Sequence, residues 1–237
     1  MPPAPEAAYG PVGGSPGNAP PTVRDKWRRL HRNCKVISCY GFLFHFGWST
    51  WERNVFPVFL AKSQGAASVG FVQSLQGVVA VVAAPAFGTW MDRTPSIRNP
   101  RRFTVAVGGF ALAAVLAATA RAEAWPLYGA MALWGVLLSA QGVFTDSVLA
   151  SSSSRGADRQ FAFVAKSTLW RLGNVAGQSL NLLYFAVGGD DWALDGLRRL
   201  MAVGVALCFS VGLLALVRDP EAREEPPSEV TVSPLVS

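Results

Sequence analysis

The chain has little charge and few of the residues that carry redox or catalytic chemistry. Only 15% of its 237 residues are charged, against about a quarter in an average soluble domain. Cysteine occurs three times, at Cys34, Cys39 and Cys208, and histidine occurs twice. An odd number of cysteines excludes a complete disulfide framework and fits free thiols that pack as small hydrophobes.

Sequence motifs of several functional classes are missing as well. The chain has no paired-histidine zinc motif, no Gly-x-Ser-x-Gly elbow and no phosphate-binding glycine loop with its lysine. A net charge of +6 would suit nucleic acid, but no recognition motif accompanies it. We therefore expect no enzyme activity, no catalytic residues, no cofactor, no bound metal and no nucleic-acid partner.

Long apolar runs are abundant. Hydrophobic residues make up 51% of the chain, and the segment 103–120 carries no charge at all. About 18 consecutive apolar residues are enough to cross a membrane as a helix. The sequence predicts an all-α membrane protein, a six-transmembrane-helix bundle surrounded by membrane lipid. The expected spans are 36–60, 66–90, 103–121, 125–149, 161–187 and 197–217.

Three regions follow from this pattern. Residues 1–35 are expected to form a disordered cytosolic tail with a basic juxtamembrane cluster, 36–217 the transmembrane domain, and 218–237 a second disordered cytosolic tail. With both termini in the cytosol, about fourteen basic residues lie on the inner side and about four on the outer side. This bias predicts a multi-pass protein with both termini cytosolic.

Span five carries a polar stripe. Ser167, Arg171, Asn174, Gln178 and Asn181 are spaced by four, three, four and three residues, so they share one face of a helix. Such residues are expensive in hydrocarbon and usually face a cavity or a partner helix. Either they line a water-filled substrate pathway in which Arg171 binds an anion, or they form hydrogen bonds to another helix. Arg171 favours the pathway, because amide side chains alone could form the hydrogen bonds between two packed helices.

Two further pairs of residues each have two interpretations. Gly173 and Gly177, behind the stripe, form a small-xxx-small pair that favours close helix packing over ligand contact. Gln73 and Gln76 in span two either line the same substrate pathway or form hydrogen bonds within the bundle.

Span one carries a second polar stripe. Ser38, His45, Ser49 and Glu52 lie at helical spacings, and Arg53 follows toward the outer end. Glu52 and His45 are candidates for proton coupling, because a buried carboxyl or an imidazole can titrate near neutrality. The alternative is that Glu52 and Arg53 pair with neighbours to hold the bundle, and that His45 is a packing residue.

The loop after span two contains a recognisable motif. The segment reads Gly88-Thr-Trp-Met-Asp92-Arg93, followed by further arginines. It resembles the cytosolic loop signature of the major facilitator superfamily, although Pro95 replaces a glycine that the family usually has. The resemblance implies that Gly88 permits close helix contact and that Asp92 and Arg93 belong to an inner gate. Asp146 and Lys166, with Arg171, look like the remainder of such a charge network.

Members of this superfamily usually have two six-span halves with the substrate site between them. The resemblance covers residues 36–217 and implies the N-terminal half. Within the superfamily, the segment 49–53 is faintly similar to the first span of iron-exporting ferroportins. We expect a secondary active transporter, or half of one, that moves a small solute by alternating access, as a homodimer or with a missing second half. The alternatives are a non-transporting scaffold or assembly partner, and a truncated inactive fragment.

Overall fold

The computed structural model describes residues 21–153, 156–188 and 192–219, and every regular element within these ranges is helical. The elements are α1 (Val23–Arg29), α2 (Arg32–Trp51), α3 (Val55–Gln64), α4 (Ala66–Arg93), α5 (Arg98–Arg121), α6 (Ala124–Ser152), α7 (Ala157–Gly188), α8 (Leu194–Cys208) and the 3-10 helix η1 (Phe209–Leu216).

Prolines set the start of three helices. Pro57, Pro100 and Pro126 each occupy the third position of their helix, in α3, α5 and α6. The first N–H groups of a helix have no partner within it, so proline removes no hydrogen bond there. In a continuous helix the ring of Pro57 would clash with the carbonyl of residue 53. The first predicted span is accordingly divided into α2 and α3 by a turn at 52–54.

Four helical segments are long and apolar enough to cross a membrane: α4, α5, α6 and the continuous stretch Leu194–Leu216 made by α8 and η1. For the described residues, the prediction of an all-helical fold with helices that could span a membrane is confirmed in this form. Helices α2 and α7 are not among these four segments, because their polar stripes lower their mean hydropathy. The predicted count of six spans is therefore not confirmed.

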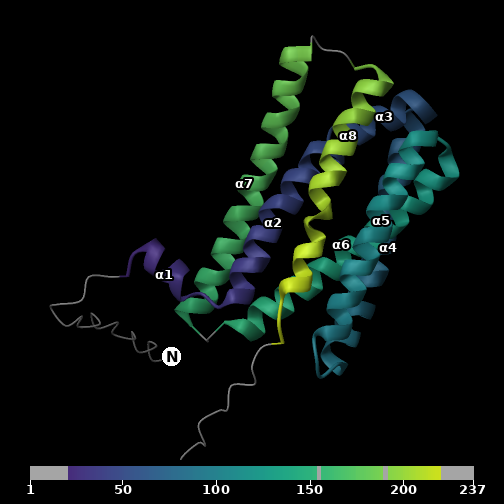
Figure 1. Cartoon of the computed structure of the whole chain (residues 1–237). Helices are drawn as coiled ribbons and strands as arrows, with labels where there is room; N and C mark the ends of the chain where they lie inside the picture. Colours follow the sequence, from purple (N-terminus) through teal and green to yellow (C-terminus); the bar gives the residue numbers. More distant parts are fainter. Residues whose placement is uncertain (1–20, 154–155, 189–191, 220–237) are drawn as a thin grey trace, which may run out of the picture.

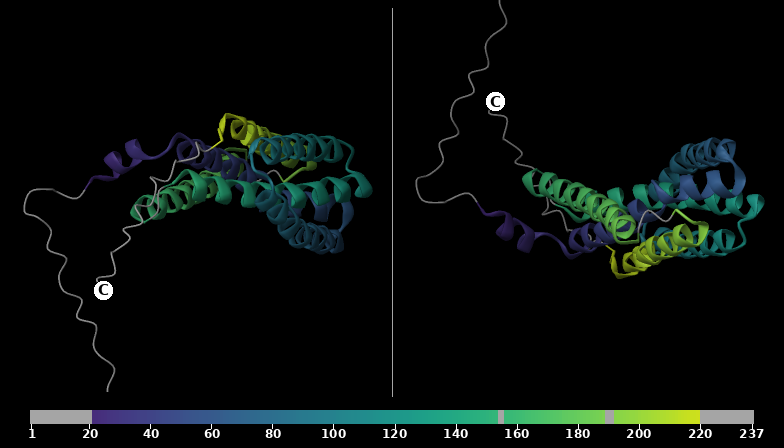
Figure 2. Two further views of the ribbon diagram at one scale, coloured as in Figure 1. Left: turned by 90° about the horizontal axis from the view of Figure 1, so that it is seen from below. Right: turned by 90° about the horizontal axis from the view of Figure 1, so that it is seen from above.

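The long helices run side by side in a bundle that is broad in one direction and thin in the other (Figures 1 and 2). Helix α2 lies along α7 on one side and contacts α8 on another, while α4 and α5 both pack against α6. This arrangement brings the two helices with polar stripes, α2 and α7, into direct contact.

Aromatic side chains form the centre of the bundle. Phe44 of α2 stacks on Trp134 of α6 with ring centroids 5.6 Å apart, and Trp51 meets the same indole edge-on at 5.0 Å. All three side chains are fully buried. The hydroxyl of Tyr40 donates to the side-chain carbonyl of Gln141. Large buried rings, of which Tyr40 has a hydrogen-bonded polar end, thus join α2 to α6.

The described ends of the chain differ from the expected tails. Residues 23–29 form α1, in which the Thr22 side chain accepts a hydrogen bond from the Asp25 N–H and the Asp25 side chain accepts one from the Thr22 N–H. Such a capping box stabilises a helix start, and the sequence prediction missed it. The predicted disorder of 1–20 and 220–237 lies outside the described residues.

Candidate functional site

Helices α2 and α7 approach each other closely through the two glycines of α7. A Cβ atom added to Gly173 would lie 2.3 Å from the Phe42 carbonyl oxygen, and one on Gly177 would lie 2.5 Å from that of Phe46. Both distances are far below contact distance, so only glycine fits. The predicted packing role of this pair is confirmed.

The polar stripe of α7 lies at the edge of this contact. The Ser49 hydroxyl of α2 donates to the Asn174 carbonyl at 2.9 Å, and the Asn181 side-chain amide donates to the Ser49 carbonyl at 3.4 Å. Arg171 and Gln178 are instead exposed. The stripe therefore serves partly as a seam to α2, while its outward members are available to water or to another molecule.

The N-terminal third of α7 holds a buried cation. The Lys166 ammonium pairs with the Asp146 carboxylate of α6 and donates to the Thr145 hydroxyl at 3.1 Å. It also lies 4.1 Å from the centroid of the Trp170 ring, which stacks on His45 at 4.2 Å. The sequence had placed Asp146 and Lys166 in one charge network, and the structure brings them together. Arg171 does not join this pair.

Glu52 caps the C-terminal end of α2, and its side chain accepts two hydrogen bonds. Its carboxylate accepts from the Trp48 indole at 2.6 Å and from the Gln76 amide at 3.2 Å. The Arg53 guanidinium lies 5.0 Å from the centroid of the Trp48 ring. Gln76 thus bonds within the bundle, which was one of its two predicted roles, whereas Gln73 is exposed.

The C-terminal end of α7 borders a groove of about 610 Å³. Its lining combines polar, aromatic and aliphatic side chains from α7, α3, the turn after α2 and the segment before α8: Arg53, Asn54, Val58, Gln178, Asn181, Leu182, Phe185 and Trp192. The Asn181 side-chain oxygen is buried without a hydrogen-bond partner in the described chain. Gln178 and Asn181 were predicted pathway residues. Arg53 and Asn54 were not, because the break in the first span was not foreseen.

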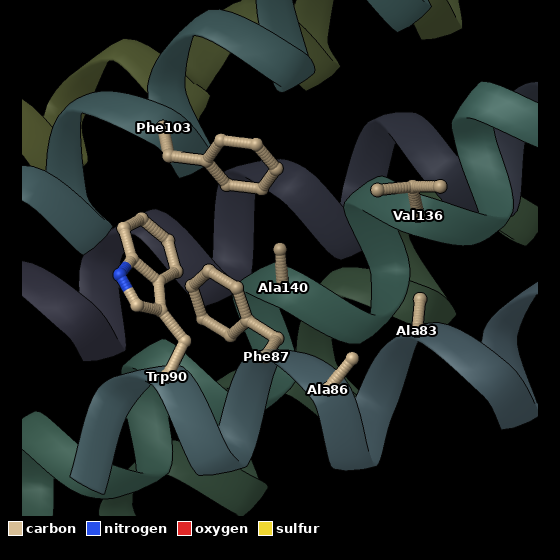
Figure 3. A pocket seen from close by; sticks show the side chains of 7 residues that line it. All are labelled: Ala83, Ala86, Phe87, Trp90, Phe103, Val136 and Ala140. Atoms are coloured by element: carbon tan, nitrogen blue, oxygen red, sulfur yellow. The ribbon is translucent and has the colours of Figure 1, made fainter. Parts of the chain in front are cut away.

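A second depression is almost entirely hydrocarbon (Figure 3). Phe87 and Trp90 of α4 and Phe103 of α5 line a groove of about 380 Å³, with the Phe103 ring centroid 5.7 Å from that of Phe87 and 5.4 Å from that of Trp90. Small side chains of α4 and α6 complete the wall: Ala83, Ala86, Val136 and Ala140. None of the predicted site residues lines this groove. Its chemistry suits an apolar group and offers nothing to hold a charged solute.

The loop motif lies at the exposed end of α4. A Cβ on Gly88 would meet no atom within 4 Å, so this glycine permits no close helix contact within the described chain, contrary to the role that the resemblance implied. Asp92 and Arg93 are both exposed, and within the described ranges neither forms an ion pair. The expected charge network is not assembled around them.

Two contacts missed by the sequence reasoning tie this loop to the end of the chain. The Asp219 carboxylate accepts from the Ile97 N–H at 2.9 Å, directly before α5 begins. The Arg101 guanidinium donates to the Val217 carbonyl. No local sequence signal marks contacts between residues more than a hundred positions apart.

No family model matches the sequence, and no curated protein shows significant similarity to it. The resemblance to the major facilitator superfamily therefore stays a prediction from the loop motif and the span pattern. Within the described residues there is also no cluster of three or more histidine, cysteine, aspartate or glutamate side chains that could hold a metal ion.

Proposed function

We propose that α2 with α3, and α7, cross the membrane beside the four apolar helices, which gives six spans with both termini cytosolic. Helix α7 has 32 residues and is therefore about 48 Å long, at about 1.5 Å per residue. That length exceeds the roughly 30 Å hydrocarbon core of a bilayer. Its direct contact with α2 along the bundle supports placing both helices at the same depth as the others (Figure 1).

We further propose that this chain is a secondary transporter, or half of one, for a small polar solute. The observation that carries the proposal is the exposure of Arg171 and Gln178 beside exposed apolar residues of α7 such as Val175. A cation and an amide facing lipid at membrane depth are strongly unfavourable. That face of α7 must therefore be covered by water or by protein, and the polar groove at its outer end supports water.

The pathway would lie between this face and a second six-span unit, as in the two-half plan of major facilitators. The second unit would be a second copy of the chain or a separate partner. In this scheme Asp146, Lys166, Asp92 and Arg93 act at the inner gate, and Glu52 with His45 couples transport to protons. The hydrogen bonds that Glu52 accepts from Trp48 and Gln76 would hold its carboxylate in place for that role.

Cysteine accessibility tests the pathway directly. The native cysteines are first replaced, and single cysteines are introduced at Arg171, Asn174 and Gln178. Leu172 serves as the matched control, since it is apolar, 50% exposed and about 100° around the same helix from Arg171. A charged, membrane-impermeant thiol reagent should label the three stripe positions and spare Leu172. Protection of all three in the purified chain and in native membranes would contradict a pathway.

A non-transporting scaffold or assembly partner remains the competing function. It predicts that the stripe is covered by another protein, so that all four introduced cysteines are protected in native membranes and the stripe cysteines become reactive only after purification. The mass of the purified chain by light scattering, with detergent subtracted, adds a second discriminator. A homogeneous dimer supports a two-half transporter made of identical copies, whereas a monomer requires a distinct second unit.

A further inference from the structure

Helix α1 is fixed against the bundle by specific contacts. The Lys35 ammonium of α2 donates to the Arg28 carbonyl at 2.9 Å, and Leu30, which follows α1, is buried. The half-buried ring of Trp27 packs against the core. The basic cluster of the sequence is therefore held in a defined place beside the first turns of α7 (Figure 1).

One flank of α1 borders a small polar pocket of about 160 Å³. It is lined by Lys26, Arg29, Leu30, His31, Cys34, Ser152, Ser153 and Asp158. Lys26 and Arg29 are exposed cations, against the single carboxylate of Asp158. The serines contribute hydroxyl groups. This wall combines a surplus of positive charge with hydrogen-bonding groups, which are the features that bind a phosphate group.

The other flank of α1 borders an apolar groove of about 580 Å³ toward α7. Its lining is mostly hydrophobic: Val23, Arg24, Trp27, Phe161, Val164, Ala165, Thr168 and Leu169. Val23 is 74% exposed and Val164 is 54% exposed, so the groove opens outward. The Lys26 ammonium lies 5.9 Å from the centroid of the Phe161 ring, where the two depressions approach each other.

We propose that the pocket and the groove together bind an anionic phospholipid of the adjacent leaflet. The phosphate would lie at Lys26 and Arg29, and an acyl chain would pack against Trp27, Phe161 and Val164. Basic residues beside a membrane span attract anionic lipids, and an apolar groove next to them matches the other end of the same molecule. A free phosphate ion would satisfy only the pocket, so the charge and the apolar surface together favour lipid. This proposal holds whether or not the chain transports a solute.

The test measures lipid binding to the full chain in mild detergent. Phosphatidylglycerol is titrated against phosphatidylcholine of the same acyl composition, with binding followed by native mass spectrometry. We expect phosphatidylglycerol to bind about tenfold tighter, given the attraction of juxtamembrane cations to anionic lipid. The double substitution Lys26→Gln with Arg29→Gln should remove most of this preference.

The matched control removes the same charge elsewhere. Arg98→Gln with Arg102→Gln changes two exposed arginines in the first turns of α5 and should leave the preference intact. An equal loss in both double variants would mean that only net charge matters, and an unchanged preference in the α1 variant would place the lipid elsewhere. Either result would overturn the proposal.

Two further experiments test the role of the apolar groove and the source of the bound phosphate group. Val164→Asn should weaken phosphatidylglycerol binding, while Val175→Asn, at a similarly exposed position of α7, should not. Inorganic phosphate should fail to compete with the lipid at equal concentration. Competition by phosphate, together with indifference to Val164→Asn, would show a site for a free anion and would refute the lipid assignment.

Discussion

Lys166 of α7 and Asp146 of α6 form an ion pair in which the lysine side chain is 6% exposed and the aspartate side chain 57% exposed. A buried charge is tolerated only when it is paired and hydrogen-bonded. The carboxylate, by contrast, keeps a large accessible surface. The pair is therefore asymmetric: the cation is fixed by its surroundings, while Asp146 can accept a second partner.

Removing the carboxylate should destabilise the protein through the lysine that remains. Asp146→Asn leaves a buried cation without its counter-charge, which we expect to cost about 1–3 kcal/mol, below the value for a fully buried pair. Thermal unfolding in detergent, followed by tryptophan fluorescence, measures the change. Adding Lys166→Met should restore most of the loss, and a double variant that is less stable than Asp146→Asn would contradict this reasoning.

The glycine contact between α2 and α7 predicts a strong position effect. Gly177→Ala places a methyl group 2.5 Å from the Phe46 carbonyl oxygen, so the helices must separate, at an expected loss of about 1–3 kcal/mol. Gly142→Ala in α6 is the control, because a Cβ there meets no atom within 4 Å and alanine favours helix. Similar unfolding temperatures for both variants would show that α2 and α7 are not closely packed in solution.

The residues that could be predicted are those with a local signal. The spacing of Gly173 and Gly177 predicts a close helix contact. An ion pair between Asp146 and Lys166 is predicted because an unpaired charge is rare at membrane depth. The break at 52–54 was not predicted, because one long helix can also accommodate Pro57 as a kink. The capping box of Thr22 and Asp25 was not predicted, because it lies within the segment 1–35 that was expected to form a tail. The Asp219 contact depends on tertiary structure and had no local signal.

Arg171 should be dispensable for folding and essential for solute binding. It is exposed and forms no hydrogen bond or ion pair with the described residues, so Arg171→Ala should leave the unfolding temperature unchanged. If the residue anchors an anionic solute, uptake into proteoliposomes should fall more than tenfold, since a charged hydrogen bond contributes about 1.5–3 kcal/mol. Arg121→Ala, another exposed arginine at the end of α5, is the control. Unchanged uptake in Arg171→Ala would remove it from the pathway.

Two substitutions of Glu52 separate its structural role from its proposed coupling role. Glu52→Gln keeps an acceptor for the Trp48 indole, whereas Glu52→Ala leaves both Trp48 and Gln76 without their partner. We expect Glu52→Ala alone to lower the unfolding temperature. If the carboxyl couples protons, both variants should lose the response of uptake to an imposed pH gradient. A normal response in Glu52→Gln would restrict the residue to a structural role.

The stability of the first turn of α1 should depend on pH. Hydrogen bonding to Thr22 lowers the pKa of Asp25 from its usual 3.8, which means that the folded helix favours the ionised carboxylate. This contribution is present above the usual pKa and is lost as the pH falls through the lowered value. Protection of the α1 amides from hydrogen exchange, corrected for the intrinsic rate, should therefore be constant near neutrality and fall at strongly acidic pH. Thr22→Ala should reduce that protection already at pH 7.

The backbone contact between α2 and α7 also has a mechanical consequence. Where carbonyl oxygens meet glycines with no side chain between them, two helices cannot slide past each other without collision. The hydrogen bond that Ser49 donates to the Asn174 carbonyl and the one that its own carbonyl accepts from the Asn181 amide hold the two helices further. Interfaces packed in this way resist shear. In any large movement of the protein, α2 and α7 would move together as one rigid unit. The displacement would then occur where this unit meets α6 and α8, and the Lys166–Asp146 pair is one of the contacts that it would stretch.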